Sequence, residues 1–181
     1  MKTFAGIGSR NISKKEENDI TYIGRKLWSY EYILFSGNAT GSDITFEMAS
    51  NGRCVLMLPY NNFNNKFYNI SNSLDSFVLG DSPEGIKVAK ELHPLHDKLD
   101  EFSLKYHARN YHQVFGYDIY PKVDFVICCA DRYSSGNIKG GTGMAARIAK
   151  KNNIKLINIR DPDWKNSFDE LIEQIEMFNS F

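Results

Sequence analysis

Cysteine is scarce in this chain of 181 residues, and the three that occur form no metal-binding spacing. Cys54 and the adjacent pair Cys128 and Cys129 lie in apolar runs, so we expect small core residues rather than a disulfide or a metal site. No apolar run is long enough to span a bilayer, and the N-terminus does not resemble a signal peptide. We therefore expect a cytoplasmic protein that contacts no membrane and needs no cofactor or metal.

An excess of positive charge is also missing, because 22 basic residues balance 22 acidic ones. This balance argues against a broad basic surface, so nucleic acid is a possible partner but not the favoured one. Neither a complete GxGxxG fingerprint nor a Walker GxxxxGK[ST] motif is present. The length fits one domain spanning residues 1–181.

Short apolar runs alternate with amphipathic segments along most of the chain. Ser13, with Glu16 three residues later, forms a capping box that predicts a helix start. This alternation with short loops predicts parallel strands joined by right-handed crossovers, an α/β three-layer sandwich with a mainly parallel sheet. We expect strands at 2–6, 32–35, 53–58, 122–130 and 155–159, with helices after 13, 43, 143 and 164.

Residues 60–105 interrupt the alternation and look like an insertion. Residues 60–81 are polar and aromatic, which predicts a loop with at most one short element. Residues 83–116 have helical character, and we expect two helices broken near His93-Pro94 because proline disfavours a continuous helix.

Three loops between an expected strand and the next helix are rich in glycine and small polar residues. Ligands of open parallel sheets bind at the carboxyl ends of strands, where glycine lets a phosphate approach the backbone and a helix N-terminus offers free N–H groups. The strongest signal is the third loop, an anion nest at a helix start. The candidate ligand-binding residues of the loops are Gly8, Ser9 and Arg10; Ser36, Gly37, Asn38, Ser42 and Asp43; and Gly140, Gly141, Thr142 and Gly143.

Residues outside these loops complete the candidate site. Arg109 and Asn110 lie in an unusually polar helical stretch and could reach a phosphate or base. Arg147 follows the third loop on the same helix and is a further candidate. Glu47 and Asp43 are the candidate catalytic carboxylates if the protein is an enzyme, although a helix-capping Asp43 and a solvated Glu47 are the alternatives.

These three loops together resemble the SLOG superfamily of Rossmann-like proteins. Within it, the chain is most similar to small stand-alone proteins of the DprA/Smf type found in phages, and it is more distantly related to LOG phosphoribohydrolases. The resemblance rests on Gly6-Ile7-Gly8-Ser9-Arg10, Ser36 to Asp43, Leu58-Pro59-Tyr60, Ala108-Arg109-Asn110 and Gly140-Gly141-Thr142-Gly143.

The resemblance implies a Rossmann-like fold, a nucleotide-like ligand and self-association into homo-oligomers. LOG enzymes carry a glutamate shortly after the glycine-rich turn, whereas Met144-Ala145-Ala146-Arg147 follows it here, so Glu47 or Asp43 would have to serve a glycosidase. We therefore expect a protein that binds a nucleotide or a cyclic nucleotide or ADP-ribose signal, sensing or sequestering it in phage–host conflict. The alternatives are an N-glycosidase of nucleoside monophosphates and a binder of single-stranded DNA.

Overall fold

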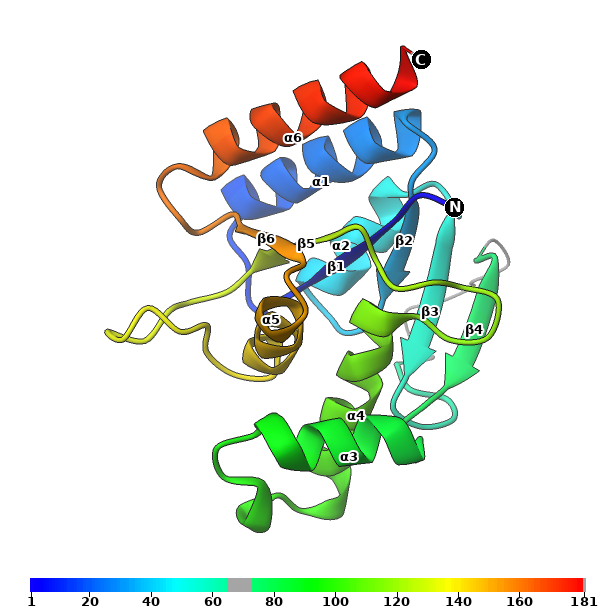
Figure 1. Cartoon of the computed structure of the whole chain (residues 1–181), viewed down its shortest axis with the longest axis vertical. Helices are drawn as coiled ribbons and strands as arrows, with labels where there is room; N and C mark the ends of the chain where they lie inside the picture. Colours follow the sequence, from blue (N-terminus) through cyan, green and yellow to red (C-terminus); the bar gives the residue numbers. More distant parts are fainter. Residues whose placement is uncertain (65–72, 181) are drawn as a thin grey trace.

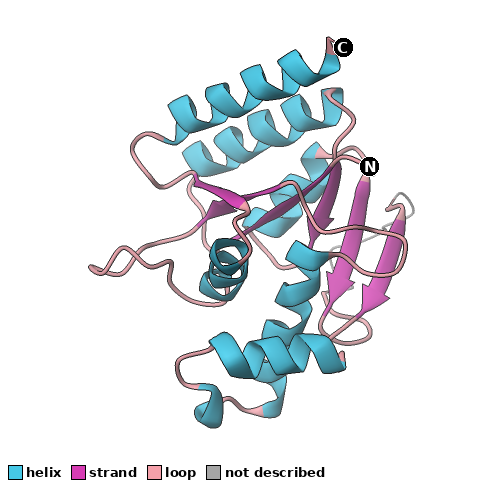
Figure 2. Cartoon of the chain, viewed as in Figure 1, coloured by secondary structure: helices cyan, strands magenta, loops and turns pink. Residues whose placement is uncertain are grey.

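The computed structural model describes residues 1–64 and 73–180, and within them six strands form one parallel sheet flanked by helices (Figure 1, Figure 2). The strands are β1 (Thr3–Gly8), β2 (Ile33–Ser36), β3 (Cys54–Leu58), β4 (Asp75–Val78), β5 (Phe125–Cys129) and β6 (Lys155–Asn158). The helices are α1 (Lys14–Ser29), α2 (Ser42–Ala49), α3 (Pro83–Leu92), the short 3-10 helix η2 (His96–Lys98), α4 (Glu101–Phe115), α5 (Thr142–Lys151) and α6 (Trp164–Asn179).

The sheet order β4-β3-β2-β1-β5-β6 places the N-terminal strand in the middle. From β1 the chain moves outward through β2, β3 and β4, and then returns to pair β5 with the free edge of β1. All five pairings are parallel. The order reverses between β1 and β5, so this point is the topological switch at which open α/β sheets bind ligands.

Two apolar layers hold the helices against the sheet. One contains Ile23 of α1, Phe46 of α2 and Phe168 of α6, whereas the other contains Val114 of α4 and Met144 of α5. Both faces of the sheet are therefore covered, which explains why β5 is buried at every position. The three-layer α/β sandwich expected from the sequence is confirmed.

Most of the expected elements form where the sequence placed them. Ser13 caps α1 with the reciprocal hydrogen bonds of a capping box to Glu16. The helical stretch divides at His93 into α3 and α4, as the His93-Pro94 pair predicted.

The three cysteines are buried and free. No helix in residues 1–64 or 73–180 is both long and apolar enough to cross a bilayer.

The strand β4 lies within the segment that we expected to be a loop with at most one short element. It adds to the outer edge of β3, and three of its four residues are exposed. Such an edge strand lacks the apolar run of a buried strand, which is why its sequence resembles a loop. Part of the expected loop, residues 65–72, lies outside the described residues.

Candidate ligand-binding site

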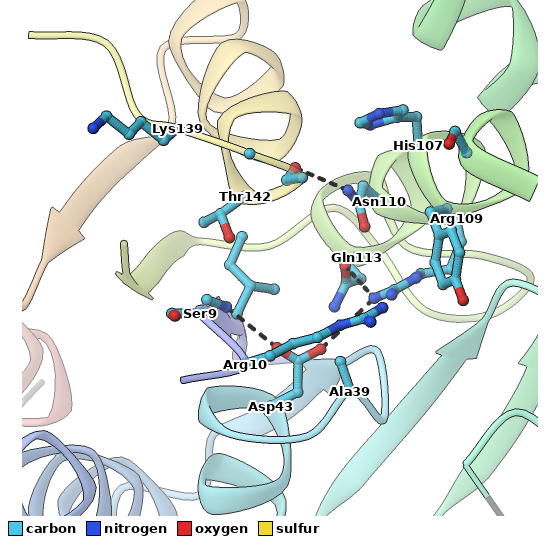
Figure 3. Close-up of a pocket in the computed structure, with 16 residues that line it drawn as sticks. Ser9, Arg10, Ala39, Asp43, His107, Arg109, Asn110, Gln113, Lys139 and Thr142 are labelled. Atoms are coloured by element: carbon cyan, nitrogen blue, oxygen red, sulfur yellow. Dashed lines mark hydrogen bonds and ion pairs between the residues drawn. The ribbon is translucent and has the colours of Figure 1, made fainter. Parts of the chain in front are cut away.

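A cavity of about 420 Å³ lies at the carboxyl ends of the central strands, next to the switch point between β1 and β5. Its volume falls within the range of small-molecule sites. The loops after β1 and β5 and the start of α2 form one side, and α4 forms the opposite wall (Figure 3). The lining residues are Ile7, Gly8, Ser9, Arg10, Ala39, Asp43, Ser103, Tyr106, His107, Arg109, Asn110, Gln113, Lys139, Gly140, Gly141 and Thr142.

The first two loops are fastened to each other at the base of the cavity. The backbone N–H and the hydroxyl of Ser42 both donate to the carbonyl of Ser9, at 3.0 Å each. Gly8 is needed here because a Cβ would lie 2.5 Å from the carbonyl oxygen of Cys129 and 2.7 Å from the Ser42 hydroxyl oxygen. Ser42 therefore positions the ligand-facing loop without lining the cavity itself.

Asp43 connects three separate segments around the cavity. Its Oδ1 accepts from the N–H of Gly8 at 3.2 Å, and its Oδ2 accepts from the N–H of Gly37 at 3.1 Å. The same Oδ2 lies 3.7 Å from Nη1 of Arg109, and both side chains are almost fully buried. Burial raises the pKa of Asp43, while Arg109 and the two N–H groups oppose that rise. Asp43 thus holds the β1 loop, the β2 loop and α4 in one arrangement.

Arg109 extends this network along the wall formed by α4. Its Nη1 donates to Oε1 of Gln113 at 2.7 Å, one helical turn later. Burial lowers the pKa of Arg109, although a guanidinium stays charged in proteins. A Cβ on Gly37 would lie 1.4 Å from Nη1 of Arg109, so the glycine makes room for the guanidinium rather than for a ligand.

The third loop brings backbone groups to the cavity at the N-terminus of α5. Asn110 donates from Nδ2 to the carbonyl of Gly141 at 3.0 Å, which fastens this loop to α4 (Figure 3). Gly140 has a positive φ of 64°, a conformation that favours glycine. Thr142 begins α5, so the positive end of the helix dipole borders the cavity, and the N–H groups of Gly143 and Met144 donate to carbonyls at the end of the loop. This arrangement favours an anionic group.

Two cationic side chains of the lining form no ion pair with any described residue. The guanidinium carbon of Arg10 lies 5.6 Å from the centre of the Tyr106 ring. Lys139 Nζ lies 5.4 Å from the centre of the Tyr133 ring. Arg10 and Lys139 therefore add positive charge that the surrounding protein does not neutralise, each beside an aromatic face. Sequence reasoning missed Lys139, although a lysine directly before a glycine run at a helix start was an available signal.

Two histidines, His93 at the end of α3 and His107 within α4, lie with their rings tilted against each other. The rings of His93 and His107 lie 4.6 Å apart, and only His107 lines the cavity. Burial lowers the pKa of His107 to about 4, helped by the neighbouring charges of His93 and Arg147. His107 is therefore neutral at pH 7 and adds no charge to the site.

Several sequence candidates lie outside the cavity lining. Ser36, Gly37, Asn38 and Ser42 support the loops from behind, and Gly143 and Arg147 line a different cavity. Asn38, for example, fixes the loop after β2 through two hydrogen bonds: its Nδ2 donates to the carbonyl of Phe63, and its backbone N–H donates to Oε1 of Glu47. The candidates that do line the cavity are Gly8, Ser9, Arg10, Asp43, Arg109, Asn110, Gly140, Gly141 and Thr142.

The two candidate catalytic carboxylates differ in their access to a ligand. Glu47 is buried and does not line the cavity. Asp43 lines it, but both of its oxygens accept hydrogen bonds from backbone N–H groups. Within residues 1–64 and 73–180, no group of three or more His, Cys, Asp and Glu side chains could hold a metal ion. The placement of Glu47 and Asp43 supports binding of a ligand more directly than acid–base chemistry.

Comparison with known proteins finds similarity at the level of structure. No protein-family model matches the chain, and no curated protein matches it. The structure of DNA processing protein A from Helicobacter pylori, described by its single-stranded DNA binding mode, superposes with a TM-score of 0.60 at 20% identity, covering 98% of this chain and 78% of that one.

Two further solved structures share the architecture. The structural-genomics target TM1055 has a TM-score of 0.55 at 15% identity, covering 88% of this chain and 75% of the other. DNA processing protein A from Streptococcus pneumoniae has a TM-score of 0.53 at 16% identity, covering 93% of this chain and 56% of the other. The chain therefore has the Rossmann-like α/β fold of the DNA processing protein A structures.

Proposed function

We propose that the cavity at the switch point binds the phosphate of a nucleotide unit, and that single-stranded DNA is the favoured source of that unit. The observation that carries the proposal is the pairing of Arg10 and Lys139, cations without an acidic partner among the described residues, with the N-terminus of α5 around one cavity. Helix N-termini and free cations are the groups that hold phosphate in proteins.

Single-stranded DNA is favoured because it uses the aromatic side chains as well as the charges. Tyr106 and Tyr133 each carry a cation against one ring face, and Tyr133 is 55% exposed. Nonspecific single-strand binding combines such aromatic platforms with a positive groove. Two of the structural neighbours are DNA processing protein A, and the Helicobacter pylori structure is described by its single-stranded DNA binding mode.

A free nucleotide or nucleotide-derived signal is the second candidate. The zero net charge of the chain favours it, because a protein that contacts many phosphates of a strand needs an excess of Lys and Arg. The volume of about 420 Å³ also suits a small molecule. In this alternative the protein senses or sequesters the molecule.

Self-association stays a prediction from the resemblance, and light scattering of the purified chain tests it.

The test measures fluorescence anisotropy of a labelled oligothymidylate titrated with the protein at several salt concentrations. We expect Arg10→Ala to weaken binding by about tenfold and to make the affinity less dependent on salt. The control is Lys165→Ala, which removes a different cation that lies over an aromatic ring, 5.6 Å from the centre of the Trp164 ring on α6. Equal losses in the two variants, or no binding at low salt, would exclude the DNA proposal.

Competition by unlabelled molecules separates the candidates. Direct binding of nucleoside monophosphates or cyclic nucleotides, measured by calorimetry on a protein that does not bind the oligonucleotide, would establish the free-nucleotide alternative. Chromatography of the same mixtures detects turnover, since an N-glycosidase releases a free base. If a free base appears, Glu47→Gln and Asp43→Asn identify which carboxylate the reaction uses.

A further inference from the structure

A second cavity of about 310 Å³ lies on another face of α5, away from the proposed nucleotide site. Its outer wall is the loop between β5 and α5, which Figure 1 shows in yellow extending from the body beside α5. Within this loop Arg132 and Ile138 form an isolated antiparallel bridge. The lining residues are Arg132, Gly136, Asn137, Ile138, Gly143, Ala146, Arg147, Lys150, Ile154 and Leu156.

The charged side chains that line this cavity are all cationic. Arg132, Arg147 and Lys150 line it, and no acidic side chain of the described residues does. Arg132 is paired with Asp161, its Nε lying 2.7 Å from Oδ1. Arg147 and Lys150 form no ion pair with any described residue, and they stand three positions apart on one face of α5.

Arg147 stands in an unfavourable position for an unpaired cation. A Cβ built on Gly143 would lie 3.4 Å from Nη1 of Arg147, so the guanidinium folds back over the first turn of α5. The positive end of the helix dipole lies there, which repels a cation. Its Nε is buried without a hydrogen-bond partner among the described residues, and burial lowers the pKa of Arg147. An anion in the cavity would offset the repulsion and would offer an acceptor to the Arg147 side chain.

Apart from Asn137, the uncharged side chains that line the cavity are apolar. Ile138 is 5% exposed and Ile154 is 9% exposed, and Ala146 and Leu156 complete the apolar lining. A simple inorganic ion would leave this apolar surface in contact with water, whereas an organic molecule would cover it. The cavity is within the size range of small-molecule sites.

We propose that this second cavity binds a small organic anion, one compact anionic group on an apolar body, with the anionic group held by Arg147 and Lys150. The proposal is independent of the nucleotide site, since neither cation lines that cavity.

The experiment uses the full chain and the fluorescent probe anilinonaphthalene sulfonate, which carries a sulfonate on an aromatic body. We expect saturable binding with one site, weakened about tenfold by Lys150→Ala and by Arg147→Gln, since each removes one charged hydrogen bond. Lys151→Ala is the matched control: this lysine lies on the same helix but pairs with Glu91 at 3.2 Å, outside the cavity. Ala146→Trp should abolish binding by filling the cavity while keeping both cations.

Three results would overturn the proposal. The first is equal affinity of Lys150→Ala and Lys151→Ala, which would show that the cavity cations do not hold the probe. The second is loss of binding in Arg10→Ala, which would place the probe in the nucleotide site. The third is competition by inorganic phosphate at concentrations equal to the probe, which would show that the apolar walls contribute nothing. Lys150 is exposed, so its variant folds and keeps the test decisive even if Arg147→Gln does not fold.

Discussion

Removal of the Arg109 guanidinium by Arg109→Met should leave the carboxylate of Asp43 buried without its charge partner. The two groups lie 3.7 Å apart with side chains about one-twentieth exposed. Coulomb attraction at that distance and an effective dielectric constant of 20 is about 4.5 kcal/mol. Breaking a buried pair on one side costs about 3–5 kcal/mol, so we expect a loss of about 4 kcal/mol in the free energy of unfolding at pH 8.

The loss should shrink as the pH falls. Burial already raises the pKa of Asp43, and without Arg109 the pKa rises further. The native state of the variant then binds a proton that the unfolded chain does not, so its stability increases as the pH is lowered. The assay is urea unfolding followed by circular dichroism at pH 8 and pH 5.5, each compared with the parent chain.

The double variant Asp43→Asn/Arg109→Met is the control. It removes the buried charge, so it should be more stable than Arg109→Met at pH 8 and should lack the extra pH dependence. Equal stability of the single and double variants at pH 8, with no recovery at pH 5.5, would refute the account of Asp43 as a buried charge held by Arg109.

Three further predictions concern the site. Gly37→Ala should destabilise the protein by about 1–3 kcal/mol, because the added Cβ would overlap Arg109. Gly141→Ala should change stability by less than about 0.5 kcal/mol, since the atom nearest to its added Cβ lies 3.9 Å away. Thermal denaturation of the two variants compares these losses. The lowered pKa of His107, about 4, means that its contribution to stability is complete above pH 6.5 and is lost as the pH falls through 4, so His107→Leu should flatten that part of a stability–pH profile. Tyr106→Leu should weaken oligothymidylate binding by about 1–3 kcal/mol if a base stacks on this ring, and anisotropy without any change would exclude that contact.

The succession of strands and helices along the chain could be predicted from the sequence, because each buried strand is an apolar run and each crossover helix has an apolar stripe. The edge strand β4 could not be placed in this way, since exposed strands lack the apolar pattern on which strand prediction depends. The pairing of Asp43 with Arg109 was also beyond sequence reasoning. Those residues are 66 positions apart in the chain, and no local pattern reports which distant side chain meets which.

The glycine-rich loops were recognised, but their residues divide into two uses that composition does not distinguish. Gly141 borders the cavity, whereas Gly37 makes room for a buried guanidinium. Gly141 precedes a helix and has room for a Cβ, whereas Gly37 directly follows a strand and has none. Arg147, in contrast, could have been assigned from helical phase: it follows Thr142 by five positions, about 140° around the helix at 100° per residue. That rotation places it in the second cavity rather than the first.

The central place of β1 has a consequence for synthesis on the ribosome. Its first neighbour, β2, emerges about thirty residues later, but its other neighbour, β5, pairs Phe125 with Phe4 and emerges only after two-thirds of the chain. Until then one edge of an apolar strand has no partner, and such edges associate with other chains. The nascent protein therefore passes through a long interval in which its first strand cannot be paired on both edges.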